Sequence, residues 1–474
     1  MVGVRELLWK YRMAGVVALV LLAAYWAYSD PYLVGDPAIL AILIGGEILL
    51  VSVGWYRKVF FAVVMVVFLL AGLALPLQEA WGAGRWAVLV CAAGVGMILW
   101  LKEPRQHFGP MHMIALFSVL AALASATVSA FPRTAFFKAS SLLLLFMYCA
   151  SGARLAILNR EWQFARNLVM ACELLTYAAA LSYFGIDSEL FGNPNSLGAV
   201  MGVAVVPLLA WGVLVADPGY QRRRRILSFS LGIGLLIFSR SRAGLLAGFG
   251  ASTFLLLNLK SYRLFLRTSL MGLAALALIG LWNPALISRS AEGVSDDLVY
   301  KGHRDGGLMA SRRAPWEATM ATIREHPFFG GGFGTTQAGA ENEKGVSNFA
   351  TTSGMVREHG NSYLALLEWV GLLGIAPFLL LLGGLVQEIR KVGQYMRRTL
   401  DGSHPAVPLA MVCLAGLLHA TFEDWLFAVG YYLSVFVWCL AFCLIDLTRE
   451  QVPARPIASE PVWRGEFVAS RSEL

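Results

Sequence analysis

The chain has 474 residues, of which 58% are hydrophobic and only 14% are charged, and its mean hydropathy is +0.64. A soluble globular protein carries roughly 25% charged residues, so this composition excludes that class and predicts an all-α, polytopic membrane protein. The net charge of +8 does not call for a nucleic-acid partner, because basic residues of membrane proteins gather in cytoplasmic loops and meet membrane lipids there. The six cysteines lie in apolar runs, and we interpret them as packing residues.

Apolar runs recur along the chain at the length that a membrane span needs, about 20 residues. The basic N-terminal segment is followed by no small-residue cleavage site, which favours a retained first helix over a cleaved signal. We predict twelve to fourteen spans, a range that arises because two runs are short for full crossings. The candidate spans lie near 14–28, 36–54, 59–76, 86–100, 112–131, 135–152, 167–184, 196–215, 226–239, 243–257, 264–281, 363–386, 406–422 and 425–446.

Lysine and arginine fall in every second connection between these spans, and the intervening short loops hold few of them. Because cytoplasmic loops are the basic ones, we predict that both termini are cytoplasmic and that the active side is periplasmic, in a bacterial inner membrane. The predicted regions are the N-terminal transmembrane helices 1–184, a transmembrane region 185–281, a partly helical periplasmic catalytic loop 282–361, C-terminal transmembrane helices 362–448 and a cytoplasmic tail 449–474.

The outer loop 282–361 is about 80 residues long, which exceeds the usual length of an unstructured connection. A helix is predicted over 311–325, with Pro315 in its first turn and Pro327 after its end. The glycine-rich stretch 329–334 follows. It lacks the lysine and hydroxyl of a phosphate-binding P-loop, so we favour a tight turn over nucleotide binding.

Arginines mark two places on the predicted outer side. Arg240 and Arg242 interrupt an apolar stretch, where they either reach to the interface or bind an anion. We favour anion binding, because the guanidinium fork matches phosphate oxygens and stays charged. Arg312 and Arg313 in the outer loop either complete such a site or belong to a solvated surface.

Further candidates lie where the outer loop meets the next span and in two short outer loops. His359 suits proton transfer or hydrogen bonding near neutral pH, against a purely structural role. Asn361, like Ser362, is predicted to cap the helix that begins there, and Asn361 is also a candidate substrate-binding residue. Glu423 and Asp424 either contact a sugar or an arginine or form a simple interfacial turn. Asn195 stands in a turn signal at the mouth of the predicted site.

The periplasmic side offers no ATP or nucleotide sugars, so a group-transfer enzyme there needs a donor that is activated elsewhere and carried across. A lipid diphosphate sugar fits these residues, with phosphates for the arginines, a polyprenyl tail for the bilayer and an acceptor in the aqueous loop. No nucleotide motif, metal-ligand cluster or serine nucleophile motif is present in the sequence, and we expect no cofactor.

The outer-side motifs together resemble the O-antigen ligase and O-antigen polymerase superfamily over roughly 185–445. The matching pieces are Phe191 to Asn195, Ser239 to Gly244, Ser311 to Arg313 with Trp316, His326-Pro327 with Gly330 to Gly334, and His359 to Leu364 followed by Gly371 and Gly374. The resemblance implies a metal-independent GT-C-type glycosyltransferase with an undecaprenyl diphosphate-linked glycan as donor. It further implies that Arg242 and an arginine of the 312–313 pair engage the diphosphate, while His359 assists the acceptor hydroxyl.

We therefore predict en bloc glycan transfer in which direct attack by an acceptor hydroxyl inverts the anomeric centre. The favoured activity is a polysaccharide or O-antigen polymerase, which uses another lipid-linked glycan as acceptor. The alternatives are an O-antigen ligase, which uses the lipid A core, and a lipid-linked glycan flippase. A chain-length regulator is left open as a partner.

Two geometric expectations accompany this function. Arg242 and Arg313 should face one cavity and share the diphosphate. The partial positive charge at the start of the helix after His359 should keep its ring neutral, so that the ring can act as a base.

Overall fold

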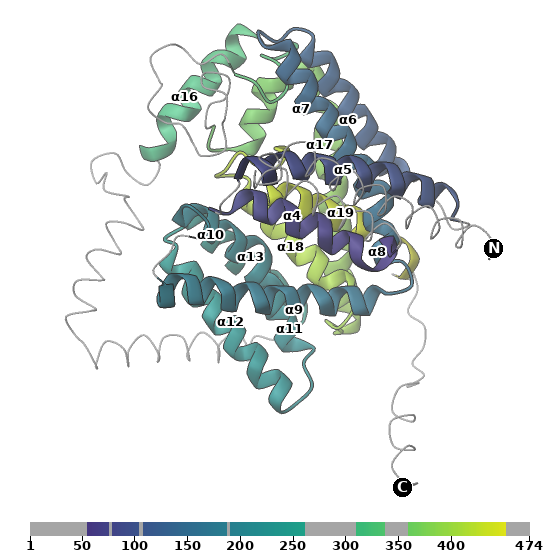
Figure 1. The fold of residues 1–474 in the computed structure, drawn as a ribbon, viewed down its shortest axis with the longest axis vertical. Helices are drawn as coiled ribbons and strands as arrows, with labels where there is room; N and C mark the ends of the chain where they lie inside the picture. The colour runs from purple at the N-terminus through teal and green to yellow at the C-terminus, as the bar shows by residue number, and fades with distance from the viewer. Residues whose placement is uncertain are drawn as a thin grey trace, which may run out of the picture.

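The computed structural model describes residues 55–74, 78–103, 108–186, 190–260, 310–336 and 359–451. Within these ranges the chain forms helices and turns and no strand, which confirms the predicted all-α class (Figure 1). The helices are α4 (Phe61–Gly72), α5 (Gln78–Leu101), α6 (Pro110–Ala126), α7 (Pro132–Tyr148), α8 (Arg154–Ile157), α9 (Glu161–Ala180), α10 (Pro194–Val200), α11 (Val206–Leu214), α12 (Tyr220–Phe238), α13 (Arg242–Asn258), α16 (Ala310–Glu325), α17 (Ser362–Thr399), α18 (Ala406–His419) and α19 (Tyr432–Gln451). Short π-helical turns occur at η1 (Tyr56–Phe60), η2 (Cys149–Ala153), η3 (Leu181–Ile186) and η4 (Met201–Val205).

Six helical segments of the described ranges are long and apolar enough to cross a membrane, and the shorter apolar helices α6 and α18 accompany them. The six segments are Trp81–Leu101, Pro132–Ile157, Glu161–Ile186, Pro194–Leu214, Ser362–Thr399 and Tyr432–Arg449. The protein is thus a multi-pass membrane protein. The candidate spans 14–28, 36–54 and 264–281 lie outside the described residues, so the total of twelve to fourteen stays a prediction.

Helix starts follow the sequence signals closely at several positions. Pro132 and Pro194 stand in the first turns of α7 and α10, where the missing N–H of proline has no helical partner to lose. The last helix is an exception, because α19 begins at Tyr432 and not at the predicted 425. Turns occupy the residues from 425 to 431. They are closed by backbone hydrogen bonds between residues close in sequence, such as Ala428 N–H to the Trp425 carbonyl at 2.9 Å.

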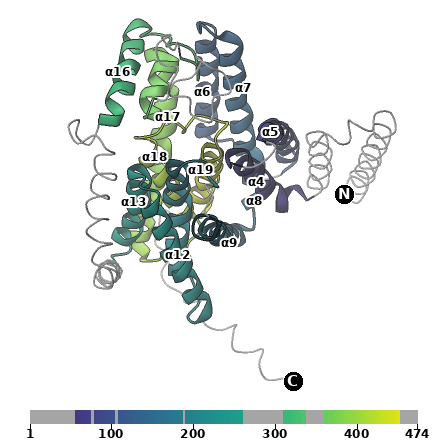
Figure 2. The same ribbon diagram turned by 60° about the vertical axis from the view of Figure 1, so that its left-hand side comes forward.

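Contacts sort the helix ends into two groups, which we call the site end and the basic end. At the site end the first residue of α17, Ser362, donates its N–H to the carbonyl of Ala420 after α18 at 2.9 Å. At the basic end Arg154 of α8 forms an ion pair with Asp446 of α19 at 2.5 Å. Figures 1 and 2 both show α16 beside α17 at the end of the molecule that α6 and α7 also reach.

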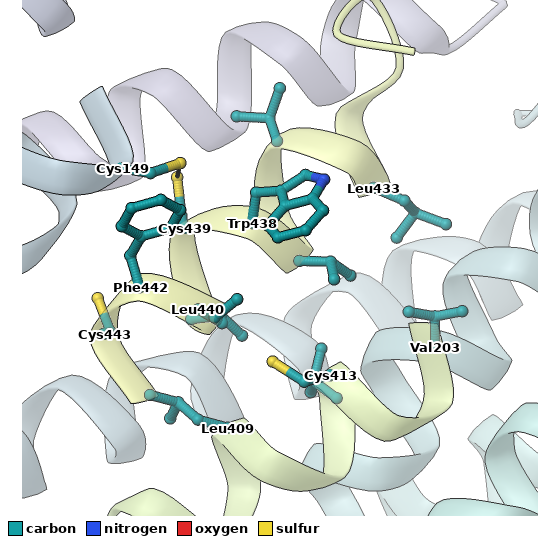
Figure 3. Packing of buried hydrophobic residues seen from close by; sticks show 14 of the residues in the cluster. Cys149, Val203, Leu409, Cys413, Leu433, Trp438, Cys439, Leu440, Phe442 and Cys443 are labelled. Carbon is teal, nitrogen blue, oxygen red and sulfur yellow. Dashed lines mark hydrogen bonds between the residues drawn. The ribbon is translucent and has the colours of Figure 1, made fainter. Parts of the chain in front are cut away.

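Helix α19 contributes many residues to the buried apolar cluster, and Figure 3 shows several of them. The rings of Trp438 and Phe442 pack on Phe146 of α7, with the Trp438 and Phe146 ring centroids 5.3 Å apart. The sulfur atoms of Cys149 and Cys439 lie 3.5 Å apart at the same contact. All six cysteines are free thiols and five of them are buried, as small packing residues.

Candidate active site

A close contact between the segment formed by α10 and η4 and the start of α13 brings two of the sequence motifs together. A Cβ atom added to Gly198 would lie 2.2 Å from the Cβ of Ser241, and one added to Gly202 would lie 2.2 Å from the carbonyl oxygen of Gly244. Only glycine permits backbones to approach so closely, which is the usual role of small residues between membrane helices. The motif 191–195, which leads into α10, therefore lies near the motif 239–244, which leads into α13.

Arg242, Arg240 and Asn195 take different positions in this region. Arg242 is the first residue of α13 and is half-buried, whereas Arg240 and Asn195 are exposed. Burial and then the positive charge of Arg312 lower the pKa of Arg242, although a guanidinium remains charged at any physiological pH. Arg242 and Arg312 are therefore close enough to repel each other, although they come from different helices.

Arg312 reaches the centre of the site from α16. Its Nη2 lies 2.5 Å from Oε1 of Glu423, and its side chain is 13% exposed. A Cβ atom at Gly360 would lie 2.7 Å from Nη1 of Arg312, so this glycine leaves the room that the guanidinium occupies. The sequence motif that contains His359 is therefore in contact with α16.

Arg313 turns away from this cluster. Its side chain is 80% exposed and pairs with Glu317, one turn further along α16, at 2.8 Å. Successive residues of a helix point about 100° apart, so only one of the two arginines can face the site. The pair that the structure brings together is Arg242 and Arg312, in place of the predicted Arg242 and Arg313.

The loop after α18 is fixed on the start of α17. The side-chain oxygen of Asn361 accepts the backbone N–H groups two and three residues further on, at 2.8 and 3.0 Å, which confirms its predicted role as helix cap. Ser362 Oγ donates to the carbonyl of Glu423 at 2.6 Å and accepts the N–H of Leu426 at 3.1 Å. These contacts place the Glu423 and Asp424 side chains beside Arg312 and His359.

The ring of His359 is held between two carboxylates and is only 1% exposed. Nδ1 lies 3.0 Å from Oδ2 of Asp424, which also accepts the His359 backbone N–H at 2.8 Å. On the other side Nε2 lies 3.3 Å from Oε1 of Glu368. The Thr336 hydroxyl lies 3.2 Å from Nε2 and donates to the same Glu368 oxygen at 2.9 Å.

These carboxylates set the charge of the histidine. Burial lowers the pKa of His359, but hydrogen bonds and charge attraction from Asp424 and Glu368 outweigh burial, and the net shift is upward. Burial raises the pKa of Asp424, and its bonds to His359 lower that pKa by more. The pKa of His359 is thus raised, whereas the positive end of the following helix was expected to keep the ring neutral. Two full negative charges outweigh a partial charge of roughly one half.

Glu368 and Thr336 are site residues that the sequence analysis did not single out. Glu368 lies inside the apolar run of α17, and its side chain is fully buried. A carboxylate in an apolar span is costly and usually marks a functional partner, so this signal was present in the sequence. Thr336 follows the glycine-rich stretch, and no local pattern marks it.

The glycine-rich stretch fills a break in α17 at Gly371, where φ is +66°. The N–H groups of Gly331 and Gly332 donate to the carbonyls of Glu368 and Trp369 at 2.8 and 3.1 Å. In return the first two N–H groups after the break donate to the carbonyls of residues 327 and 328 at 2.8 and 3.1 Å. This exchange satisfies the backbone groups that the break exposes, and it supports the predicted tight-turn role.

A second histidine, His419, lies close enough to Arg312 to experience its charge. The indole N–H of Trp425 donates to Nδ1 of His419 at 2.8 Å, and an indole nitrogen can only donate. The remaining ring hydrogen is therefore on Nε2 of His419, which is buried and without a partner among the described residues. The cluster thus holds a neutral N–H donor in addition to its two arginines.

The arrangement suits reactions that move negative charge. Arg242 and Arg312 offer positive charge to a diphosphate, and the partly exposed Glu423 and Asp424 can accept hydrogen bonds or a proton. His359 and Glu368 lie behind Asp424, away from solvent.

Comparison with known proteins agrees with these motifs. Residues 227–379 match the family described as O-antigen ligase, a segment that contains Arg242, Arg312, His359 and Glu368. No curated protein matches the chain. The family match confirms, over this segment, the predicted resemblance to the O-antigen ligase and O-antigen polymerase superfamily.

Proposed function

We propose that the protein transfers a glycan en bloc from an undecaprenyl diphosphate carrier to the hydroxyl of an acceptor sugar, at the periplasmic face of the inner membrane. The observation that carries this proposal is the approach of two arginines from different helices, Arg242 and Arg312, beside the His359–Asp424 pair. A diphosphate needs this kind of double positive contact, and the apolar helices around the site suit a polyprenyl tail.

The two arginines engage the diphosphate and stabilise the charge that grows on it as the anomeric carbon–oxygen bond breaks. The acceptor oxygen forms the new glycosidic bond from the opposite face, and the configuration inverts. The acceptor proton passes to the carboxylate of Asp424, because Asp424 is 25% exposed whereas its partner His359 is buried. His359 thus assists through Asp424 and does not take the proton directly.

The acceptor decides between polymerase and ligase. The polymerase is the activity favoured from sequence, but the matched family is described as O-antigen ligase, so transfer to a lipid A core is at least as well supported. Both activities require the same donor site and the same bond formation. They differ only in the sugar that approaches Asp424.

The test is transfer by the purified protein in lipid nanodiscs, with a defined undecaprenyl diphosphate-linked glycan as donor. One reaction contains a second lipid-linked glycan as acceptor, and the other contains a lipid A core. Arg242→Ala should abolish transfer to either acceptor, and Arg242→Lys should restore it only in part, because a point charge cannot make a two-pronged contact. Arg240→Ala is the matched control, since this exposed arginine lies two residues away. Full activity of Arg242→Ala would rule out the diphosphate contact.

A further inference from the structure

Glu368 is the one charged residue in the first two thirds of α17, from residue 362 to residue 387. Its side chain is fully buried and contacts polar groups from other segments, among them His359 Nε2 at 3.3 Å and the Thr336 hydroxyl at 2.9 Å. A buried carboxylate is tolerated only where such partners compensate for its lost hydration. The position of Glu368 is therefore tied to His359.

The backbone of Glu368 is held by the same segment that supplies Thr336. Its carbonyl accepts the N–H of Gly331 at 2.8 Å, and the helix breaks three residues later at Gly371. Thr336 is fixed in turn, because its neighbour Thr335 lies 2.8 Å from the hydroxyl of Ser129 between α6 and α7. Glu368, Thr336 and His359 thus form one connected unit at the site end.

We propose that Glu368 is a positioning residue for glycan transfer, which holds the Nε2 side of His359 directly and through the Thr336 hydroxyl. This inference rests on the proposed function, because it concerns the His359–Asp424 pair of the same site. Glu368 is too deeply buried to contact either sugar, so it acts through His359.

The geometry also fixes what His359 can do. Nδ1 faces a carboxylate oxygen of Asp424 and Nε2 faces one of Glu368, so both nitrogens are placed to donate hydrogens. A ring with hydrogens on both nitrogens is a cation. Its position is fixed, and its charge stabilises the neighbouring Asp424 carboxylate. Neither nitrogen is then available as a base.

Other groups act on this unit from the neighbouring elements. Lys138 of α7 is close enough to Asp424 for their opposite charges to attract, and its ammonium group donates to the carbonyl of Gly334 at 2.5 Å. Arg312 of α16 pairs with Glu423, and the uncharged ring of Trp369 lies at nearly a right angle to the His359 ring, with the two ring centroids 5.5 Å apart. None of these groups contacts Nε2 in the described structure, so Glu368 is the charge on that side.

The first measurement does not depend on activity. Histidine ring signals are followed by NMR against pH in nanodiscs that contain labelled protein, with His359→Asn to assign the signal of His359. In Glu368→Gln the His359 ring should lose its proton at lower pH than in the unaltered protein. Thr336→Val should also lower the pH at which the His359 ring loses its proton, but by a smaller amount. An unchanged midpoint in both variants would overturn the proposal.

The second measurement is turnover with the lipid-linked donor. Glu368→Gln should lower kcat about tenfold or more, the usual range for losing a hydrogen bond to a charged group, while KM for the donor stays the same. The alkaline limb of the pH profile should move to lower pH. The matched control is Glu388→Gln, because Glu388 is also a buried carboxylate of α17 and accepts from the Thr448 hydroxyl at 2.5 Å. Equal effects of both substitutions on kcat and on the limb would reject a specific positioning role.

The two measurements separate this inference from the proposed function. If the unaltered protein transfers no glycan and the NMR midpoint still falls in Glu368→Gln, the function fails and the contact stands. If transfer is robust and neither the midpoint nor the limb moves, the function stands and the positioning role fails.

Discussion

Arg312 and Arg313 are neighbours in sequence with opposite surroundings. Arg312 pairs with Glu423 inside the cluster, and Arg313 lies in solvent with Glu317. Arg312→Ala should therefore lower kcat at least about a hundredfold, the scale for losing one group that stabilises developing charge, whereas Arg313→Ala should stay within about twofold because exposed pairs contribute little. Steady-state kinetics with the lipid-linked donor measures both. If Arg313→Ala lowers kcat more than Arg312→Ala does, Arg313 is the arginine that contacts the diphosphate.

The carboxylates around His359 give the reaction a definite pH dependence. Because the pKa of His359 is raised, the imidazolium persists above the ordinary value of about 6.5, and its contribution is lost only as pH rises through that raised value. Turnover should thus be retained near neutral pH and fall on the alkaline side. Asp424→Asn should lower kcat about a hundredfold or more and move the alkaline limb to lower pH. Turnover that rises with pH over this range would instead indicate a neutral histidine base.

Sequence patterns identified part of the site, residue by residue. Arg242 and His359 stood out because charged groups in apolar or junction positions are rare, and Asn361 followed the rule for helix caps. The sequence prediction paired Arg313 with Arg242, whereas Arg312 is the arginine in the cluster. The rotation of α16 about its axis decides between the two, and it depends on contacts with Gly360 and Glu423 from other segments. The same holds for the charge of His359, since Glu368 and Asp424 are remote in sequence.

At the scale of elements, the break in α17 is the feature on which the site depends. A Cβ at Gly371 would lie 2.4 Å from the carbonyl oxygen of Phe328, and the φ of +66° disfavours any other residue. Gly371→Ala should destabilise the protein by about 1–3 kcal/mol. It should also reduce transfer, because the glycine-rich stretch would lose its hydrogen-bonded contact with the backbone of Glu368.

Gly383 offers the control in the same helix. A Cβ there meets nothing within 4 Å, so Gly383→Ala should be neutral or stabilise by up to about 1 kcal/mol. Thermal unfolding in detergent, followed by circular dichroism, compares the two variants. Equal stability of both would show that the break does not need its glycine.

The elements themselves were largely predictable. Eleven candidate spans fall on described helices, and α16 runs over Ala310–Glu325 against a predicted 311–325. Hydrophobic run length and proline positions are local, which explains this agreement. The break in α17 and the late start of α19 were not predictable, because both are set by hydrogen bonds from segments far away in the sequence.

At the scale of the whole molecule, the charge pattern assigns the loops that meet at the site end to one side of the membrane. It assigns the loops that meet at the basic end to the other side. The side that faces the periplasm follows from labelling of single cysteines. Five of the six native thiols are buried, so an introduced cysteine should react first. Glu317→Cys on α16 should react with an impermeant thiol reagent in intact cells, and Arg222→Cys at the start of α12 should react only after permeabilisation. The reverse pattern would invert the predicted topology.

The hydroxyl of Thr336 and Nε2 of His359 lie 3.2 Å apart, although 22 residues connect Thr336 to His359 in the sequence. The entropy of closing such a loop grows only slowly with its length, by about 0.6 kcal/mol for each doubling. Residues can therefore be added or removed there with little effect on the positions of Thr336 and His359. The length of this connection can thus change in evolution while the hydrogen-bonded unit around His359 stays the same.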